Sequence, residues 1–150
     1  MATINIDVST GEVERAIQQL IDRSSNLRPP FMSIGESMIN STRQRFRDEE
    51  APDGSTWAPL SPVTTARKGH DRILESESRQ LARQLSYTAT GDSLEWGSSM
   101  VYAAMQHFGG RQSQHPHLWG DIPARPFLGL SDDDEEDIVE TLRDWLEGAI

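Results

Sequence analysis

The amino-acid sequence predicts a single α+β domain spanning residues 1–150, in which a small antiparallel or mixed sheet packs with N-terminal and C-terminal amphipathic helices. Three observations lead to this prediction. Apolar residues recur at helical spacing towards both ends of the chain, and two short alternating runs between them indicate strands. Proline-rich stretches, which favour long loops, separate the elements. A chain of 150 residues has the size of one ordinary domain.

Two amphipathic helices are expected in the N-terminal third of the chain. Ser9 and Glu12 have the spacing of a capping box, and the helix that follows is predicted to end near residues 24–26. The next helix can begin at Pro29 and Pro30, because proline is tolerated in the first helical turn, and it extends to about residue 47. The apolar positions are Val13, Ala16, Ile17, Leu20 and Ile21 in the first helix and Phe31, Ile34, Met38, Ile39, Thr42 and Phe46 in the second.

Arginine dominates the basic side chains, since Lys68 is the only lysine among 14 basic residues. Arginine suits bidentate pairing with carboxylates at interfaces better than lysine does. Arg43, Arg45 and Arg47 lie away from the best apolar positions of the second helix. This face of the helix is expected either to be exposed to solvent or to bind a partner.

Residues 48–73 are expected to be irregular apart from a short helical turn near residues 63–68, because their prolines exclude a central strand. A loop this long in a small domain is usually functional or ordered by a partner. Trp57 lies within it, and Trp119 lies in a second predicted surface loop over residues 111–121. Each ring is expected either to fold back over the core or to be covered by another subunit. The tryptophans on patterned elements, predicted to be core residues, are Trp96 and Trp145.

The middle of the chain predicts a short helix over residues 77–85, followed by strands at about 86–90 and 93–98. Gly91 and Asp92 separate the strands, and glycine suits a two-residue hairpin turn because it can supply a positive φ. A helix is then expected over residues 101–108, and residues 122–130 are predicted to form an edge strand or an extended arm. The apolar positions of the 101–108 helix are Val101, Ala104, Met105 and Phe108, and Gly109 and Gly110 end it.

Negative charge is concentrated at the C-terminus. Of the net charge of −10, residues 131–150 contribute −8, with nine acids against one base. Ser131 is predicted to cap a last helix whose apolar positions are Ile138, Leu142, Trp145, Leu146 and Ala149. The run at residues 132–137 is more acidic than a helix start requires, so it indicates a solvated helix start, a surface facing a partner or a lumen, or a cation site. Its members are Asp132, Asp133, Asp134, Glu135, Glu136 and Asp137, without the spacing of a calcium loop.

Composition and motifs argue against several classes of function. The chain has no cysteine, which excludes a thiol nucleophile or a thiolate zinc site, and its negative charge argues against general binding of nucleic-acid backbones. It lacks an apolar run long enough for a transmembrane helix, a signal-peptide pattern, and the G-x-S-x-G, P-loop and G-x-G-x-x-G motifs. No catalytic, cofactor-binding or metal residue is therefore assigned, and no enzyme activity is expected. The titratable residues considered and set aside are Glu75, Glu77, His115, His117 and His107, the last expected in a final helical turn that tolerates a cation.

Three segments, in order, resemble the phage virion morphogenesis family, the Mu-like and P2-like group of tail-completion and head–tail joining proteins. Residues 52–60, PDGSTWAPL, resemble its D-G-x-x-W-x-P-L segment. Residues 97–109 and residues 122–130, IPARPFLGL, resemble two later blocks, the last of which precedes an acidic C-terminal helix. Residues 87–90 depart from the family pattern, because they lack a T-G-x-L signature.

The resemblance implies a structural virion component that acts at the neck, completing the tail or preparing its junction with the capsid, as a ring such as a hexamer. Its partners would be copies of itself and other phage neck, tail or connector proteins, with DNA passing through without specific binding and with no membrane. It would be made in the host bacterial cytoplasm and reside in the virion. The candidates for subunit contacts are Asp53, Gly54, Trp57, Pro59, Leu60, Trp119, Arg125, Pro126, Phe127 and Leu128, and the acidic run at residues 132–137 would face a lumen or a partner.

Three other functions remain open at this stage. A capsid-assembly factor absent from the mature particle would carry the same motifs. An acidic inhibitor that mimics DNA would explain the net charge, although its acids would have to be spread over a face rather than gathered in one run. A small hydrolase would require converging titratable groups, which the sequence does not indicate.

Overall fold

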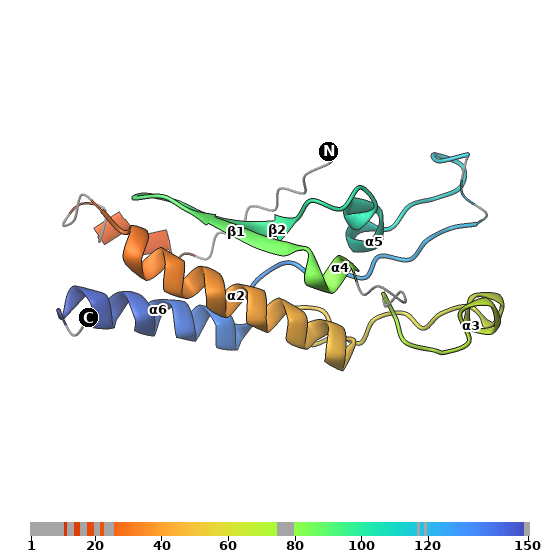
Figure 1. Cartoon of the computed structure of the whole chain (residues 1–150), viewed down its shortest axis with the longest axis horizontal. Helices are drawn as coiled ribbons and strands as arrows, with labels where there is room; N and C mark the ends of the chain where they lie inside the picture. Colours follow the sequence, from red (N-terminus) through yellow and green to blue (C-terminus); the bar gives the residue numbers. More distant parts are fainter. Residues whose placement is uncertain are drawn as a thin grey trace.

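The computed structural model describes residues 11, 14–15, 18–19, 22, 26–74, 80–116, 118 and 120–148. A two-stranded hairpin lies along one side of the long helix α2, and α6 runs antiparallel to α2 on its other side (Figure 1). This arrangement confirms the predicted α+β class. The elements are α2 (Arg28–Asp48), α3 (Pro62–Lys68), α4 (Gln80–Arg83), β1 (Leu85–Ala89), β2 (Leu94–Ser98), α5 (Ala103–Phe108) and α6 (Asp132–Leu146).

Helix α2 organises the fold because it packs against both the hairpin and α6. It begins with proline in its first turn, as predicted, and is followed by its C-cap Glu49, which adopts the left-handed conformation with φ 58°. Its buried apolar face agrees with the predicted one. At Gly35 the hairpin approaches so closely that a Cβ atom would lie 2.5 Å from the ring of Tyr87. Only glycine fits this crossing without displacing the ring.

The hairpin is confirmed at the predicted place, with Leu85 paired to Ser98 and Ala89 paired to Leu94. The physical reason given for its turn is wrong, because Gly91 does not adopt a positive φ. Instead, the hydroxyl oxygen of Thr90 accepts a hydrogen bond of 3.1 Å from the backbone N–H of Ser93. A threonine side chain therefore closes the turn locally, as serine and threonine hydroxyls commonly do.

Helix α6 begins with a complete capping box. The N–H of Asp134 donates to the Ser131 hydroxyl, and the N–H of Ser131 donates back to the Asp134 carboxylate, each over 3.0 Å. Ile138 and Leu142 are buried against α2, as predicted. Leu146, another apolar position of the predicted helix, is exposed.

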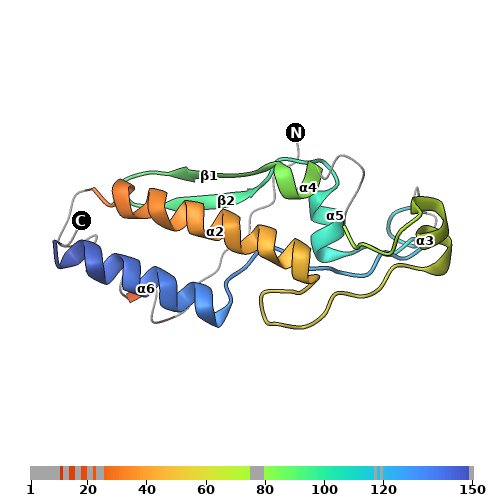
Figure 2. The same ribbon diagram turned by 60° about the horizontal axis from the view of Figure 1, so that its bottom comes forward.

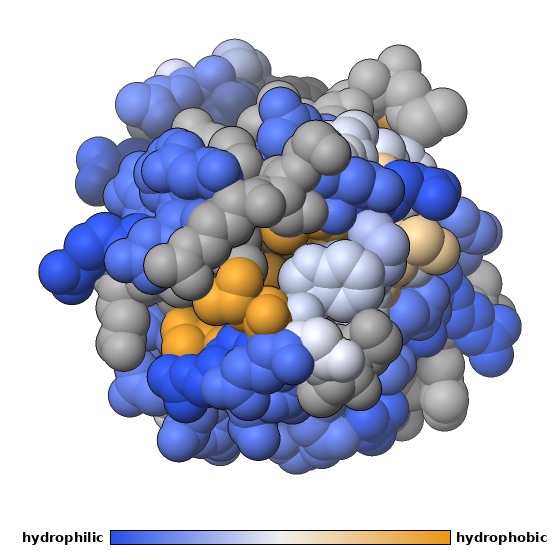
Figure 3. Space-filling model, turned by 90° about the vertical axis from the view of Figure 1, so that its left-hand side faces the viewer, coloured by the Kyte–Doolittle hydropathy of each residue, from blue (hydrophilic) through white to orange (hydrophobic). Residues whose placement is uncertain are grey.

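The end of the molecule where α2 begins and α6 ends is largely hydrophilic, with an apolar area near its centre (Figure 3). Met32 and Leu146 are the exposed large apolar residues of these two helix ends. Trp145 is half-buried beside the cluster beneath them, and Trp96 packs against the edge of both core clusters. These two tryptophans therefore contribute to the core only in part.

Helix α5 lies where the sequence predicts a helix, but it turns a different side inwards. Ala103 and His107 are buried, whereas Val101, just before the helix, and Phe108 are 71% and 59% exposed. The orientation is set by the 122–130 segment, because the N–H of Arg125 donates to the carbonyl of Gln106 over 2.9 Å. The predicted apolar stripe through Val101 and Phe108 is therefore wrong.

Some predicted features fall outside the described residues. The described positions before residue 26 are helical and exposed, and the predicted apolar face of that first helix lies outside them. Of the 77–85 helix, the structure describes α4 and the residues after it. The side chains of Glu75, Glu77, His117, Trp119 and Ala149 also lie outside the described part.

Candidate assembly interface

The two proline-rich motif segments, residues 51–61 and 122–130, lie against each other and are called the paired segments below. Neither enters the sheet, so of the two expectations for residues 122–130 the edge strand is wrong, and the segment runs outside the sheet as an arm that packs against its own chain. The indole Nε1–H of Trp57 donates to the carbonyl of Pro126 over 2.7 Å. In return, Arg125 donates from Nε to the carbonyl of Ala58 and from Nη2 to that of Pro59, over 2.8 and 3.0 Å. These side chains satisfy backbone carbonyls that have no strand partner.

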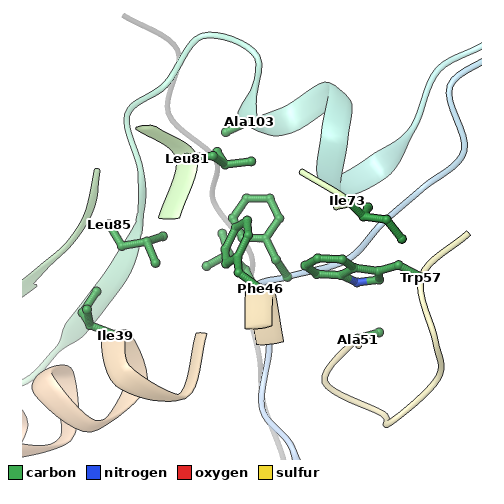
Figure 4. Packing of buried hydrophobic residues seen from close by; sticks show 10 residues of the cluster. Ile39, Phe46, Ala51, Trp57, Ile73, Leu81, Leu85 and Ala103 are labelled. Carbon is green, nitrogen blue, oxygen red and sulfur yellow. The ribbon is translucent and has the colours of Figure 1, made fainter. Parts of the chain in front are cut away.

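Trp57 and Phe127 form the centre of the larger hydrophobic cluster, with 3% and 0% of their surfaces exposed. The ring of Phe46 lies between them, with centroids 5.5 Å from Trp57 and 5.4 Å from Phe127. Figure 4 shows the indole with Ala51 and Ile73 on either side. Of the two alternatives for Trp57, the loop folds back over the core.

This burial corrects the expectation that a neighbouring subunit covers Trp57, Arg125, Phe127 and Leu128. The chain buries all four itself. Arg125 is only 6% exposed, and burial lowers the pKa of its guanidinium, whose donors serve its own backbone rather than a partner. The motif residues therefore act within the subunit, where they fix the course of two loops.

The tight contact between the paired segments also involves a glycine. Gly129 has a φ of 144°, and a Cβ atom there would lie 2.9 Å from the ring of Pro52. Asp53 and Gly54 form the adjacent exposed turn, in which the Asp53 carboxylate accepts the N–H of Ser55 over 2.9 Å. The Ser55 hydroxyl also donates to this carboxylate over 2.5 Å, and the hydrogen bonds from the hydroxyl and then from the N–H of Ser55 lower the pKa of Asp53.

A buried ion pair joins the paired segments to both long helices. Arg45 of α2 donates from Nη2 to the carboxylate of Asp134 in α6, and from Nη1 to the carbonyl of Phe127 over 2.9 Å. Ser41 donates to the other carboxylate oxygen over 2.6 Å. Burial lowers the pKa of Arg45, and the negative charge of Asp134 partly opposes this effect.

The ion pair corrects two predictions. Arg45 lies neither on a solvated face nor on a partner-binding face, because its long side chain reaches inwards between the helices. Asp134 likewise faces neither a lumen nor a partner. The remaining acids of the run are exposed, apart from the half-buried Glu135. They therefore remain candidates for a surface that faces a lumen or a partner: Asp132, Asp133, Glu135, Glu136 and Asp137.

His107 is a buried polar residue with a role that the sequence did not indicate. Its Nδ1 accepts the backbone N–H groups of Phe127 and Leu128 over 3.3 and 3.4 Å. Burial lowers the pKa of His107, which favours the neutral ring. The expectation of a tolerated cation at the end of α5 is therefore wrong, because the histidine points into the core rather than out to solvent.

A surface lies next to the paired segments at one end of the molecule. It comprises α3, α5 and residues 110–116, 118 and 120–123, and is called the distal end. Helix α3 is capped by Ser61, contributes no buried residue, and projects from the body at the end opposite the C-terminus (Figures 1 and 2). Two hollows lie on either side of residues 121–123. One is lined by Leu60, Leu74 and Tyr102 among others, and the other by Phe108 and Arg111.

Exposed apolar side chains gather at the distal end. Of the six exposed large apolar residues among the described ones, four lie there or directly beside it: Val63, Val101, Tyr102 and Phe108. Of the predicted contact residues, Leu60 is half-buried and lines the same hollow as the exposed Pro59. These two therefore remain candidates for subunit contacts. The signal for this surface in the sequence is the apolar pattern at residues 101–108, which by itself does not tell a buried helix face from an exposed one.

Two negative findings apply to the part of the chain that the structure describes. No helix there is both long enough and apolar enough to cross a membrane. No group of three or more histidine, aspartate or glutamate side chains there has an arrangement suited to a metal ion.

This chain has relatives among known phage and prophage proteins. It is similar to the protein named "Putative capsid assembly protein G" of Escherichia phage Mu, with 26% identity over 98% of this chain and 96% of that protein. It is equally similar, at 26% identity over 96% of both chains, to "Mu-like prophage FluMu G protein 2" of Haemophilus influenzae. No solved structure matches. The sequence model of the phage virion morphogenesis family matches residues 8–147, and the chain therefore belongs to that family.

Proposed function

We propose that this phage assembly protein is a structural component of the neck, where it forms a homo-oligomeric ring that completes the tail or prepares its junction with the capsid. Its partners would be copies of itself and neighbouring neck, tail or connector proteins, and DNA would pass through the ring without specific binding. No bond is made or broken in this role. Family membership supports an assembly function, and the neck, the ring and the partners are the proposal.

The distal end is the observation that carries the proposal. Monomeric proteins rarely leave large contiguous apolar surfaces exposed, and such surfaces usually mark contacts with other molecules. Val101 and Phe108 are more than half exposed, and Tyr102 lies between them in sequence and lines a hollow. Hydrogen bonds of Arg125 and Trp57 join the paired segments next to this end.

Size-exclusion chromatography with multi-angle light scattering on the full chain tests the ring. We expect a single closed species whose mass is a small multiple of 16.8 kDa and does not grow with concentration. A monomer at every concentration would contradict the proposal. A series of species that lengthens with concentration would replace the ring by an open filament.

A second candidate function is a capsid-assembly factor that leaves before the particle matures. The observation that favours it is the name of the phage Mu relative, which refers to capsid assembly. Mass spectrometry of purified virions separates the two. A neck component is expected in the particle at a constant copy number, whereas an assembly factor is expected only in immature particles.

A further inference from the structure

We propose that the distal end of one copy binds the exposed acidic face of α6 on a second copy, so that the subunits associate head to tail. This inference rests on the proposed homo-oligomeric function and names the two surfaces that meet in it. Its occupant is a second copy of this chain, and the argument for that occupant is the opposite charge of the two surfaces.

The hollows of the distal end combine apolar walls with a basic rim. Together they are lined by four basic side chains, Arg67, Lys68, Arg111 and Arg125, against a single acidic one, Asp121. Lys68 is half-buried and donates to the carbonyl of Arg72, so the exposed charges are those of Arg67, Arg111 and Asp121, which sum to +1. Arg67 and Arg111 are exposed, whereas Arg125 lies beneath the surface. The rest of the chain is acidic, so this end is a local exception to the overall charge of −10.

Helix α6 carries the complementary charge. Its segment, residues 131–150, has a net charge of −8, and only Asp134 of the 132–137 run is committed to a buried ion pair. Glu136, Asp137 and Glu140 are exposed. The same helix ends at Leu146, whose exposed side chain supplies an apolar contact for the hollows.

The two surfaces lie too far apart on one subunit to satisfy each other. The distal end is at one extremity of the elongated molecule, and α6 runs along α2 towards the other extremity (Figures 1 and 2). A contact between them therefore joins different patches of two copies. Head-to-tail contacts of this kind generate a ring when the rotation between neighbours closes, and opposite charges fix the register of the two partners.

Paired charge reversals test the contact. The first variant, Arg67→Glu with Arg111→Glu, changes the distal end, and the second, Glu136→Lys with Glu140→Lys, changes α6. Both acids of the second variant lie beyond the first helical turn, where lysine would oppose the helix dipole. Arg47→Glu and Glu95→Lys reverse exposed charges outside both surfaces and serve as matched controls. Circular dichroism and thermal melts establish that each variant folds.

We expect each double variant alone to lose the oligomer that the wild-type chain forms, while both controls retain it. An equimolar mixture of the two variants should regain association, in species that contain equal numbers of each. A chain that carries all four reversals should also regain it, because its contacts are again between opposite charges. Raising the ionic strength should weaken the wild-type contact, because salt screens exposed charges over about 8 Å at physiological concentration.

The inference is overturned if both double variants keep the wild-type mass, or if their mixture stays dissociated. In either case the wild-type oligomer, and with it the proposed function, still stands. Only a monomeric wild-type chain would remove both. Should one reversal impair folding, the neutral variants Arg67→Gln and Glu136→Gln provide the measurement, each expected to weaken association up to roughly fivefold, as loss of an exposed ion pair does.

Discussion

Arg45 and Asp134, 89 positions apart in sequence, form a buried ion pair that ties α2 to the first turn of α6. Asp134 has two further duties, since it also accepts the N–H of Ser131 and the hydroxyl of Ser41. Arg45 reaches on to the carbonyl of Phe127. One arginine and one aspartate thus connect two helices and a motif segment, and removing either leaves several groups without partners.

Replacing Arg45 by methionine should lower the free energy of unfolding by about 3–5 kcal/mol, because it leaves a buried carboxylate without its counter-charge. The double change Arg45→Met with Asp134→Asn should cost less than Arg45→Met alone, since the asparagine oxygen can still cap α6 and no buried charge remains. Urea denaturation measures both. Arg47→Met, on the exposed side of the same helix, should stay within about 0.5 kcal/mol of wild type. Equal losses at the two arginines would contradict the role of the ion pair.

Replacing Trp57 by alanine should destabilise the subunit by about 3–5 kcal/mol, as loss of a large buried ring usually does. Trp57→Phe should cost less, because it keeps much of the packing but leaves the carbonyl of Pro126 without its donor. Thermal unfolding of the subunit is the measurement. The exposed Val63→Ala is the control, with an expected change within about 0.5 kcal/mol. If Trp57→Ala abolished the oligomers while the melting temperature stayed unchanged, Trp57 would be an interface residue.

The stability of the fold should fall as the pH drops below neutrality, and His107 should cause part of the loss. Burial places the pKa of His107 in the folded chain below the unfolded value of about 6.5. As the pH falls through that value, the unfolded chain takes up a proton before the folded chain does, so folding weakens.

The variant His107→Asn isolates this contribution, since its side-chain oxygen can accept in place of Nδ1 but does not titrate. Its unfolding free energy should depend less on pH between pH 7 and about 5.5, a window chosen to lie above the usual carboxylate pKa values. Gln114→Asn, at an exposed loop position, is the control and should keep the wild-type slope, because neither side chain titrates. An unchanged slope in His107→Asn would exclude this histidine as the source.

Gly35→Ala should destabilise the fold by about 1–3 kcal/mol, the usual cost of forcing extra atoms into a packed site. The new Cβ atom would lie 2.5 Å from the ring of Tyr87, so the hairpin or the ring would have to move. Gly120→Ala is the control, because nothing lies within 4 Å of the Cβ position there. Chemical denaturation compares the two, and similar values for both would show that the hairpin yields without strain.

Local elements could be predicted from the sequence because their signals are local. Ser131 predicts the start of α6, and Pro29 and Pro30 predict the start of α2. The alternation of apolar and polar residues predicts the two strands. Even so, the turn at Gly91 is predicted at the correct position but from the wrong cause. The Thr90 hydroxyl closes it, and Gly91 has no positive φ.

The long-range contacts could not be predicted in the same way. Arg45 looks like a surface residue on a helical wheel, and its burial depends on Asp134, far away in sequence, arriving beside it. His107 is buried only because residues 122–130 cross α5 there. For the same reason, the sequence predicts an interface for motif residues whose partner is the chain itself, and the helical spacing of Phe108 does not reveal its exposure.

The reciprocal hydrogen bonds between Trp57 and Pro126 and between Arg125 and Ala58 have a consequence for protein engineering. Neither of the paired segments can hold its path alone, because each supplies the hydrogen-bond donors for backbone carbonyls of the other. A chimera that takes one of the paired segments from a distant relative and keeps the other would lack some of the donors or carbonyls that hold the two together. Grafts should fold correctly only when both paired segments are transferred together.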